Sequence, residues 1–139
     1  MFKKFFILLV VMVAFGWSSY AIAGPNMKEG LWEITTKVEM PGMPVAMPAR
    51  THTQCITKGD PVPQKPESRE RQKCKFVEKK IVGDTVIWTM KCQAKKGTMV
   101  MKGRITYKGN TFDGKIKMKT PDGMEMTQHI SGRRVGECK

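Results

Sequence analysis

The sequence predicts an all-β fold, in which an antiparallel meander forms a small barrel or a strongly curled sheet stapled by two disulfide bonds. Three observations lead to this prediction. After residue 30, hydrophobic and polar residues alternate in short runs, which is typical of strands with one buried face. Glycine-containing turn signals separate these runs. Four cysteines follow residue 54, and no long amphipathic helix pattern appears after residue 23.

The first 23 residues have the features of a secretory signal peptide. Lys3 and Lys4 supply the positive start, residues 5–15 are uniformly apolar, and residues 21–23 form an A-x-A cleavage motif. The apolar run is shorter than the roughly 20 residues of a membrane-spanning helix, so an uncleaved anchor is the less favoured alternative. We therefore expect residues 24–139 to form a single exported β domain, periplasmic or secreted, without a transmembrane segment after cleavage.

The first elements of this domain are two strands and a loop. Residues 31–40 alternate so that Trp32, Ile34 and every second residue up to Met40 share one face. Residues 50–57 predict a second strand. Residues 58–72 are rich in proline and charge, which predicts a surface loop with one short helical turn at residues 67–71.

The cysteines predict a disulfide framework. Cys55, Cys74, Cys92 and Cys138 form an even set without C-x-x-C spacing, which argues against a zinc knuckle or a thioredoxin-like site. Residues 74–92 predict a hairpin. A three-residue loop at residues 82–84 sets Cys74 opposite Cys92 and leaves Cys55 to pair with Cys138, whereas a two-residue loop shifts the register by one and weakens this pairing.

Turn chemistry sets the register of the last two hairpins. Gly109 and Asn110 indicate a type II′ turn, and the TPDG segment at residues 120–123 indicates a type I turn with a bulge. The core face of the resulting sheet carries a row of methionines with two more nearby: Met101, Met118 and Met126, then Met99 and Met124. The outer face carries two pairs of like charges: Lys102 opposite Lys117, and Arg104 opposite Lys115.

The chain is strongly basic, with a formal net charge of +13 at pH 7, and only two of its lysines lie in the signal segment. Like charges directly opposite each other destabilise a sheet. The four paired cations are therefore either a solvated surface or an anion-binding site for an envelope component or an acidic partner. Because the aromatic residues of that hairpin fall on the other face, we expect no sequence-specific nucleic-acid recognition.

Methionine is also abundant, since ten of the 12 methionines follow residue 23. Thioethers select Cu(I), so Met40, Met43 and Met47 in the MPGMPVAMP segment are candidate metal ligands. The alternative is structural. Prolines make this loop a rigid connector, and methionine is a good filler for an irregular core.

No pattern indicates catalysis. Ser68, Ser131, His52 and His129 are the serines and histidines after residue 23, and neither G-x-S-x-G nor H-E-x-x-H occurs. We expect no enzymatic activity and no cofactor. The expected function is a non-enzymatic binding or envelope-associated module, whose interior either encloses a small apolar ligand or is simply filled by its own side chains.

Several short segments in a fixed order resemble a known family. They are GLWEIT at residues 30–35, MPGMP at 40–44, TQCIT at 53–57, IWTMKC at 87–92, Y-x-G-x-x-F-x-G at 107–114 and GRRVGEC at 132–138. This order resembles the bacterial exported proteins grouped as domain of unknown function family 3617, over nearly the whole chain after residue 23. The resemblance implies a signal-bearing, cysteine-containing, mostly β envelope domain without an established activity, and it supplies no site residues.

Overall fold

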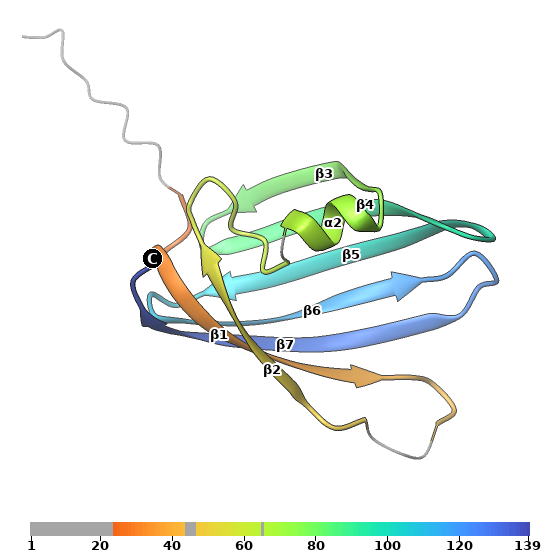
Figure 1. The fold of residues 1–139 in the computed structure, drawn as a ribbon, viewed down its shortest axis with the longest axis horizontal. Coiled ribbons are helices and arrows are strands. Elements are labelled where there is room, and N and C mark those ends of the chain that lie inside the picture. The colour runs from red at the N-terminus through yellow and green to blue at the C-terminus, as the bar shows by residue number, and fades with distance from the viewer. Residues whose placement is uncertain (1–23, 44–46, 65) are drawn as a thin grey trace, which may run out of the picture.

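The computed structural model describes residues 24–43, 47–64 and 66–139, so the predicted signal peptide lies outside the described residues (Figure 1). In chain order the elements are β1 (Gly30–Glu39), β2 (Arg50–Ile56), α2 (Pro66–Arg71), β3 (Cys74–Val82), β4 (Thr85–Ala94), β5 (Gly97–Tyr107), β6 (Thr111–Lys119) and β7 (Glu125–Gly136). The all-β prediction is confirmed, and the predicted helical turn is α2.

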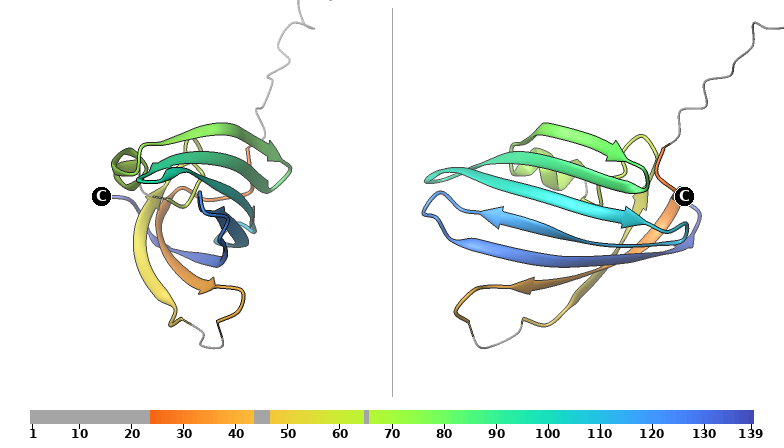
Figure 2. Two further views of the ribbon diagram at one scale, coloured as in Figure 1. Left: turned by 90° about the vertical axis from the view of Figure 1, so that its right-hand side faces the viewer. Right: turned by 180° about the vertical axis from the view of Figure 1, so that it is seen from behind.

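The seven strands form one sheet in the order β2-β1-β7-β6-β5-β4-β3, and every neighbouring pair is antiparallel. Strands β3 to β7 form the predicted meander, and β1 pairs with β7, so the first and the last of the described strands lie side by side. Viewed end on, the sheet curls strongly, and β2 and β3 are its two edges (Figure 2). Of the two predicted architectures, the strongly curled sheet is the one found.

The curl gives the sheet a concave face and a convex face. On β1, Trp32 and Ile34 are fully buried on the concave face, while the intervening residues are more exposed. The two hairpins after β4 have the predicted registers, since Tyr107 lies opposite Phe112 and Met118 opposite Met126. Local turn chemistry was sufficient here because neither strand pair shifts its register between the turn and the strand ends.

The β3–β4 hairpin corrects one prediction. Its turn has two residues, because Val82 rather than Ile81 lies opposite Thr85. A β-bulge between Phe76 and Glu78 then restores the expected register at the far end, where Cys74 lies opposite Cys92. A bulge inserts one extra residue into one strand, so it cancels the one-residue error at the turn.

One end of the concave face is tightly packed, and we call it the closed half. The rings of Trp32, Tyr107 and Phe112 meet there with centroids 5.3 to 5.7 Å apart. Two glycines make room for such rings. A Cβ at Gly132 would lie 2.2 Å from the ring of Phe112, and one at Gly103 would lie 2.1 Å from the ring of Trp88. Aromatic packing against bare backbone therefore fills this half.

The segment between β2 and β3 covers the closed half, which corrects the prediction of a surface loop at residues 58–72. Pro61 and Val62 are fully buried. The Tyr107 hydroxyl donates a hydrogen bond of 2.6 Å to the Pro61 carbonyl. Apolar side chains and a satisfied carbonyl allow this part of the loop to be buried. The prediction failed because it weighed the proline and charge content of the whole loop.

Candidate functional site

Beyond the closed half, the concave face continues as an open half that none of the described segments fills. Met101 on β5, Met118 on β6 and Met126 on β7 are directly opposite one another, as predicted. Met101 is buried, whereas Met118 and Met126 are only half-buried. The predicted packing role therefore holds for Met101 and in part for Met118, which packs against the core, while Met118 and Met126 also line open space.

Two adjoining cavities occupy the open half. The larger has a volume of about 640 Å³ and the smaller about 360 Å³. They have five lining residues in common, and we therefore treat them as one methionine groove: Thr36, Arg50, Met118, Met126 and Gln128. A groove of this size falls within the range of roughly 300–1,000 Å³ that is usual for small-molecule sites.

The groove has an apolar floor and a polar rim. The floor comes from the sheet, and its apolar members are Met99, Met101, Ile116, Met118, Met126 and Ile130. The rim comes from β2 and from the segment that carries α2, and its members are Arg50, His52, Gln64, Ser68 and Gln72. No described residue that lines either cavity is acidic. The arrangement suits a molecule that is mainly apolar and carries few polar atoms.

Two contacts hold the rim in place. Asp60 forms an ion pair with Arg69 of α2, and the Lys79 ammonium lies 4.0 Å from the same carboxylate. The Tyr107 hydroxyl anchors the residue that follows Asp60, Pro61. Burial, followed by the nearby Asp60 carboxylate, raises the pKa of Tyr107 well above its usual value. The phenol therefore stays protonated and remains a hydrogen-bond donor at neutral pH.

The structure separates the three methionines that were predicted as metal ligands. Met40 and Met47 line the smaller cavity together with Met118 and Met126. Met43 does not line it and is 61% exposed. The Cu(I) site at these three residues stays a prediction. Among the described residues, no group of three His, Cys, Asp or Glu side chains is placed to hold a metal ion.

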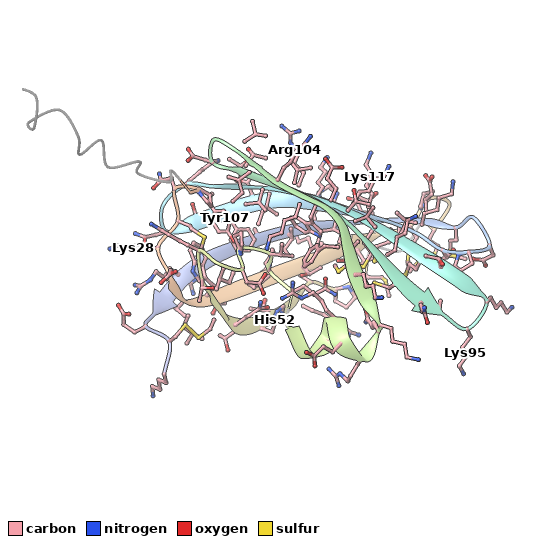
Figure 3. The ribbon with its side chains drawn as sticks, turned by 90° about the horizontal axis from the view of Figure 1, so that it is seen from above. Lys28, His52, Lys95, Arg104, Tyr107 and Lys117 are labelled. Atoms are coloured by element: carbon pink, nitrogen blue, oxygen red, sulfur yellow. A yellow bond between two sulfur atoms is a disulfide. The ribbon has the colours of Figure 1, made fainter. Side chains whose placement is uncertain are left out.

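The four predicted anion-binding residues lie together on the convex face, and two of them, Lys102 and Lys117, line a separate cavity of about 530 Å³ that Met118 and Met126 also border. Lys102 is opposite Lys117 and Arg104 is opposite Lys115, as the hairpin register predicted. In Figure 3, Arg104 and Lys117 lie on the other side of the sheet from His52 and α2. None of the four is in an ion pair with a described carboxylate. Their anion-binding role stays a prediction.

The cysteines form the two expected bonds, and these stand at opposite ends of the sheet. Cys55 is bonded to Cys138 near the closed half, where β2 meets the C-terminal end of the chain. Cys74 is bonded to Cys92 in the β3–β4 hairpin. The Cys92 Sγ lies 3.7 Å from the Met101 Sδ, so the second bond adjoins the floor of the groove.

Ser68 and His52 both line the larger cavity, although they are far apart in sequence. Among the described residues, no hydrogen bond joins their side chains, and Ser68 Oγ instead accepts one from Arg71 at 3.5 Å. An activated serine needs a base within hydrogen-bond reach. Ser68 and His52 are therefore two polar groups on the rim, and His52 does not activate the Ser68 hydroxyl as a nucleophile.

The sequence analysis missed Arg50 and the rest of the polar rim. A signal was present in the pairing of β1 with β2. On the concave face, the row changes from Trp32 opposite Gln54, through Ile34 opposite His52, to Thr36 opposite Arg50. Polarity thus increases toward one end of both strands. That change predicts a solvent-open end of the sheet interior.

Within the described residues, no helix combines the length and the apolar character needed to cross a membrane. Searches of curated proteins and of solved structures found no match. Residues 27–138 match the model of the family described as Protein of unknown function (DUF3617). The chain therefore belongs to this family, as the order of its short motifs predicted.

Proposed function

We propose that this protein is an exported, non-enzymatic binding protein that holds a small apolar molecule in the methionine groove. The observation that carries the proposal is the groove itself, two adjoining cavities of about 640 and 360 Å³ with a methionine floor. Protein interiors are normally packed to crystal-like density, so an unfilled half of a sheet interior is unusual.

The composition of the floor supports a binding role. Methionine side chains are flexible and polarisable, and they adapt to apolar partners of different shape. The closed half already supplies a packed aromatic core. The domain therefore has a core even when the open half is empty, and the open half is available for a ligand.

Export agrees with the covalent framework. Two disulfide bonds are consistent with an oxidising compartment, and they join all the cysteines of the described chain. Together with the predicted signal peptide, they support a periplasmic or secreted location.

The test uses the processed protein purified from the periplasm and titrated with the neutral fluorescent probe N-phenyl-1-naphthylamine. We expect saturable binding that Met126→Lys abolishes, because a charge is then placed in the apolar floor. Met124→Lys is the matched control, since Met124 is 54% exposed and does not line the groove. Absence of probe binding, or equal loss in both variants, would contradict the proposal.

A Cu(I) site is a second candidate, because four methionines from the loop and the sheet line the smaller cavity: Met40, Met47, Met118 and Met126. Thioether sulfur is the ligand that Cu(I) prefers. Replacing all four by leucine separates the two functions. Apolar binding should survive this change, whereas Cu(I) held against a competing chelator should be lost. Failure of the unaltered protein to retain Cu(I) would remove this candidate.

A further inference from the structure

We propose that the ligand of the methionine groove is an amphiphile with one apolar chain and an anionic head group, and that Arg50 binds the head group. This inference rests on the proposed function and specifies its ligand. It follows from the distribution of charge along the groove, from the position of Arg50, and from the apolar floor that leads away from it.

The charge around the groove has one sign. The residues that line the two cavities include one arginine and one histidine, Arg50 and His52, and no described lining residue is a carboxylate. The remaining polar lining residues are neutral: Thr36, Gln64, Ser68, Gln72 and Gln128. A groove that is lined by a permanent cation and by no carboxylate favours an anion at that point.

Arg50 stands where the two cavities adjoin. It is the first residue of β2, lies opposite Thr36 of β1, and lines both cavities. Its side chain is in no ion pair or side-chain hydrogen bond with another described residue. The guanidinium of Arg50 is therefore available for a carboxylate or a phosphate, which it can bind through two parallel hydrogen bonds.

The floor beside Arg50 can bind the apolar chain of the amphiphile. Met118 and Met126 line both cavities with Arg50, and Met101 and Met99 continue the floor in the larger cavity. An uncharged apolar molecule would use this floor and leave the guanidinium without a partner. An anionic amphiphile uses both parts of the groove, and its head group stays at the solvent-exposed rim.

The head-group chemistry has two sources, a free fatty acid or a lipid phosphate. The test therefore compares three ligands with the same twelve-carbon chain: dodecanoate, monododecyl phosphate and dodecanol. Each displaces N-phenyl-1-naphthylamine from the processed protein. We expect the anion that matches the natural head group to bind about tenfold or more tightly than dodecanol, the usual gain from a charge-assisted hydrogen bond. The tighter of the two anions identifies the source.

Variants assign the effect to Arg50. Arg50→Gln should bring the affinity for the preferred anion down to that for dodecanol and leave dodecanol binding unchanged. Arg50→Lys should retain part of the difference, because the charge remains without the two-pronged geometry. Arg104→Gln is the matched control, since it removes the same charge from the convex face and should leave the difference intact.

The outcomes separate this inference from the proposed function. Equal binding of both anions and dodecanol by the unaltered protein would overturn the role of Arg50 while keeping the apolar groove. A difference that persists in Arg50→Gln, or that is lost equally in Arg104→Gln, would also overturn it. Absence of binding by all three ligands and by the probe would overturn the proposed function itself. Thermal unfolding of each variant confirms that it is folded.

Discussion

The two halves of the concave face are built on the same strands, yet they differ in what covers them. The closed half is covered by buried residues of the β2–β3 segment, which the Tyr107 hydroxyl anchors at the Pro61 carbonyl. The open half receives from the same segment Pro63 and, at its rim, polar residues such as Gln64 and Gln72. The strands extend further than the covering segment does, and the remainder of their apolar face becomes a groove.

This difference separates stability from binding within one sheet. Fully buried aromatic and branched side chains supply the closed half with apolar burial and close packing, which are the main sources of folding free energy. The open half exposes half-buried methionines, whose burial the proposed ligand would complete. Substitutions in the closed half should therefore change stability, and those in the open half should change binding.

The largest effect is expected from Trp32→Ala in the closed half. Removing this fully buried ring should lower the free energy of unfolding by about 3–5 kcal/mol. Met126→Ala in the open half should cost only about 1 kcal/mol, because its side chain is half-buried in the free protein. Urea unfolding with the disulfide bonds intact measures both values. Equal costs would show that the two halves do not differ in packing.

The two disulfide bonds extend the comparison. The Cys55–Cys138 bond spans a sequence separation of 83 residues, and the Cys74–Cys92 bond spans 18. Their removal by paired alanine substitutions should cost about 2–5 kcal/mol each, and the longer loop should cost about 1 kcal/mol more. Only loss of the Cys74–Cys92 bond should weaken probe binding, since it adjoins Met101. Weaker binding after loss of the Cys55–Cys138 bond would contradict this assignment.

Tyr107→Phe tests the cover of the closed half. It should lower the free energy of unfolding by about 1–3 kcal/mol, because the buried Pro61 carbonyl loses its donor. The fold raises the pKa of this phenol, so the associated stability is present below its unfolded pKa of about 10 and is lost as the pH rises toward the folded pKa. The free energy of unfolding, measured below and above pH 10, should fall more steeply with pH in the unaltered protein than in the variant. Parallel pH profiles of the two proteins would contradict this prediction.

The smallest effect is expected on the convex face of the same strands. Lys117→Glu replaces a like-charge pair with Lys102 by an opposite-charge pair, which should stabilise the fold by about 0.2–1 kcal/mol at low salt. Lys95→Glu is the control, because Lys95 lies in a turn and has no cross-strand partner in the β4–β5 register. A disproportionate loss of heparin retention in Lys117→Glu would support the predicted anion-binding surface. Equal losses would indicate that net charge alone determines retention.

Local patterns predicted most of the strands and two of the hairpins. Alternation was sufficient for the faces of β1, and glycine-containing turns were sufficient for the row of Met101, Met118 and Met126. The bulge between Phe76 and Glu78 was not predictable, because no turn residue marks it. The burial of Pro61 and Val62 was also missed, since it depends on a surface supplied by distant strands.

The sequence by itself determined the all-β class, the side-chain faces and the family, because each depends on residue types at short or regular spacing. The predicted disulfide partners are the ones found, but Cys74 lies opposite Cys92 only because the bulge in β3 offsets the shorter turn. Only the tertiary structure decided which part of the concave face is filled. That outcome depends on where the β2–β3 segment lies across the sheet and on how tightly the sheet curls. Both result from contacts between residues far apart in the chain, such as Tyr107 and Pro61, and the methionine groove is the part of the interior that those contacts leave open.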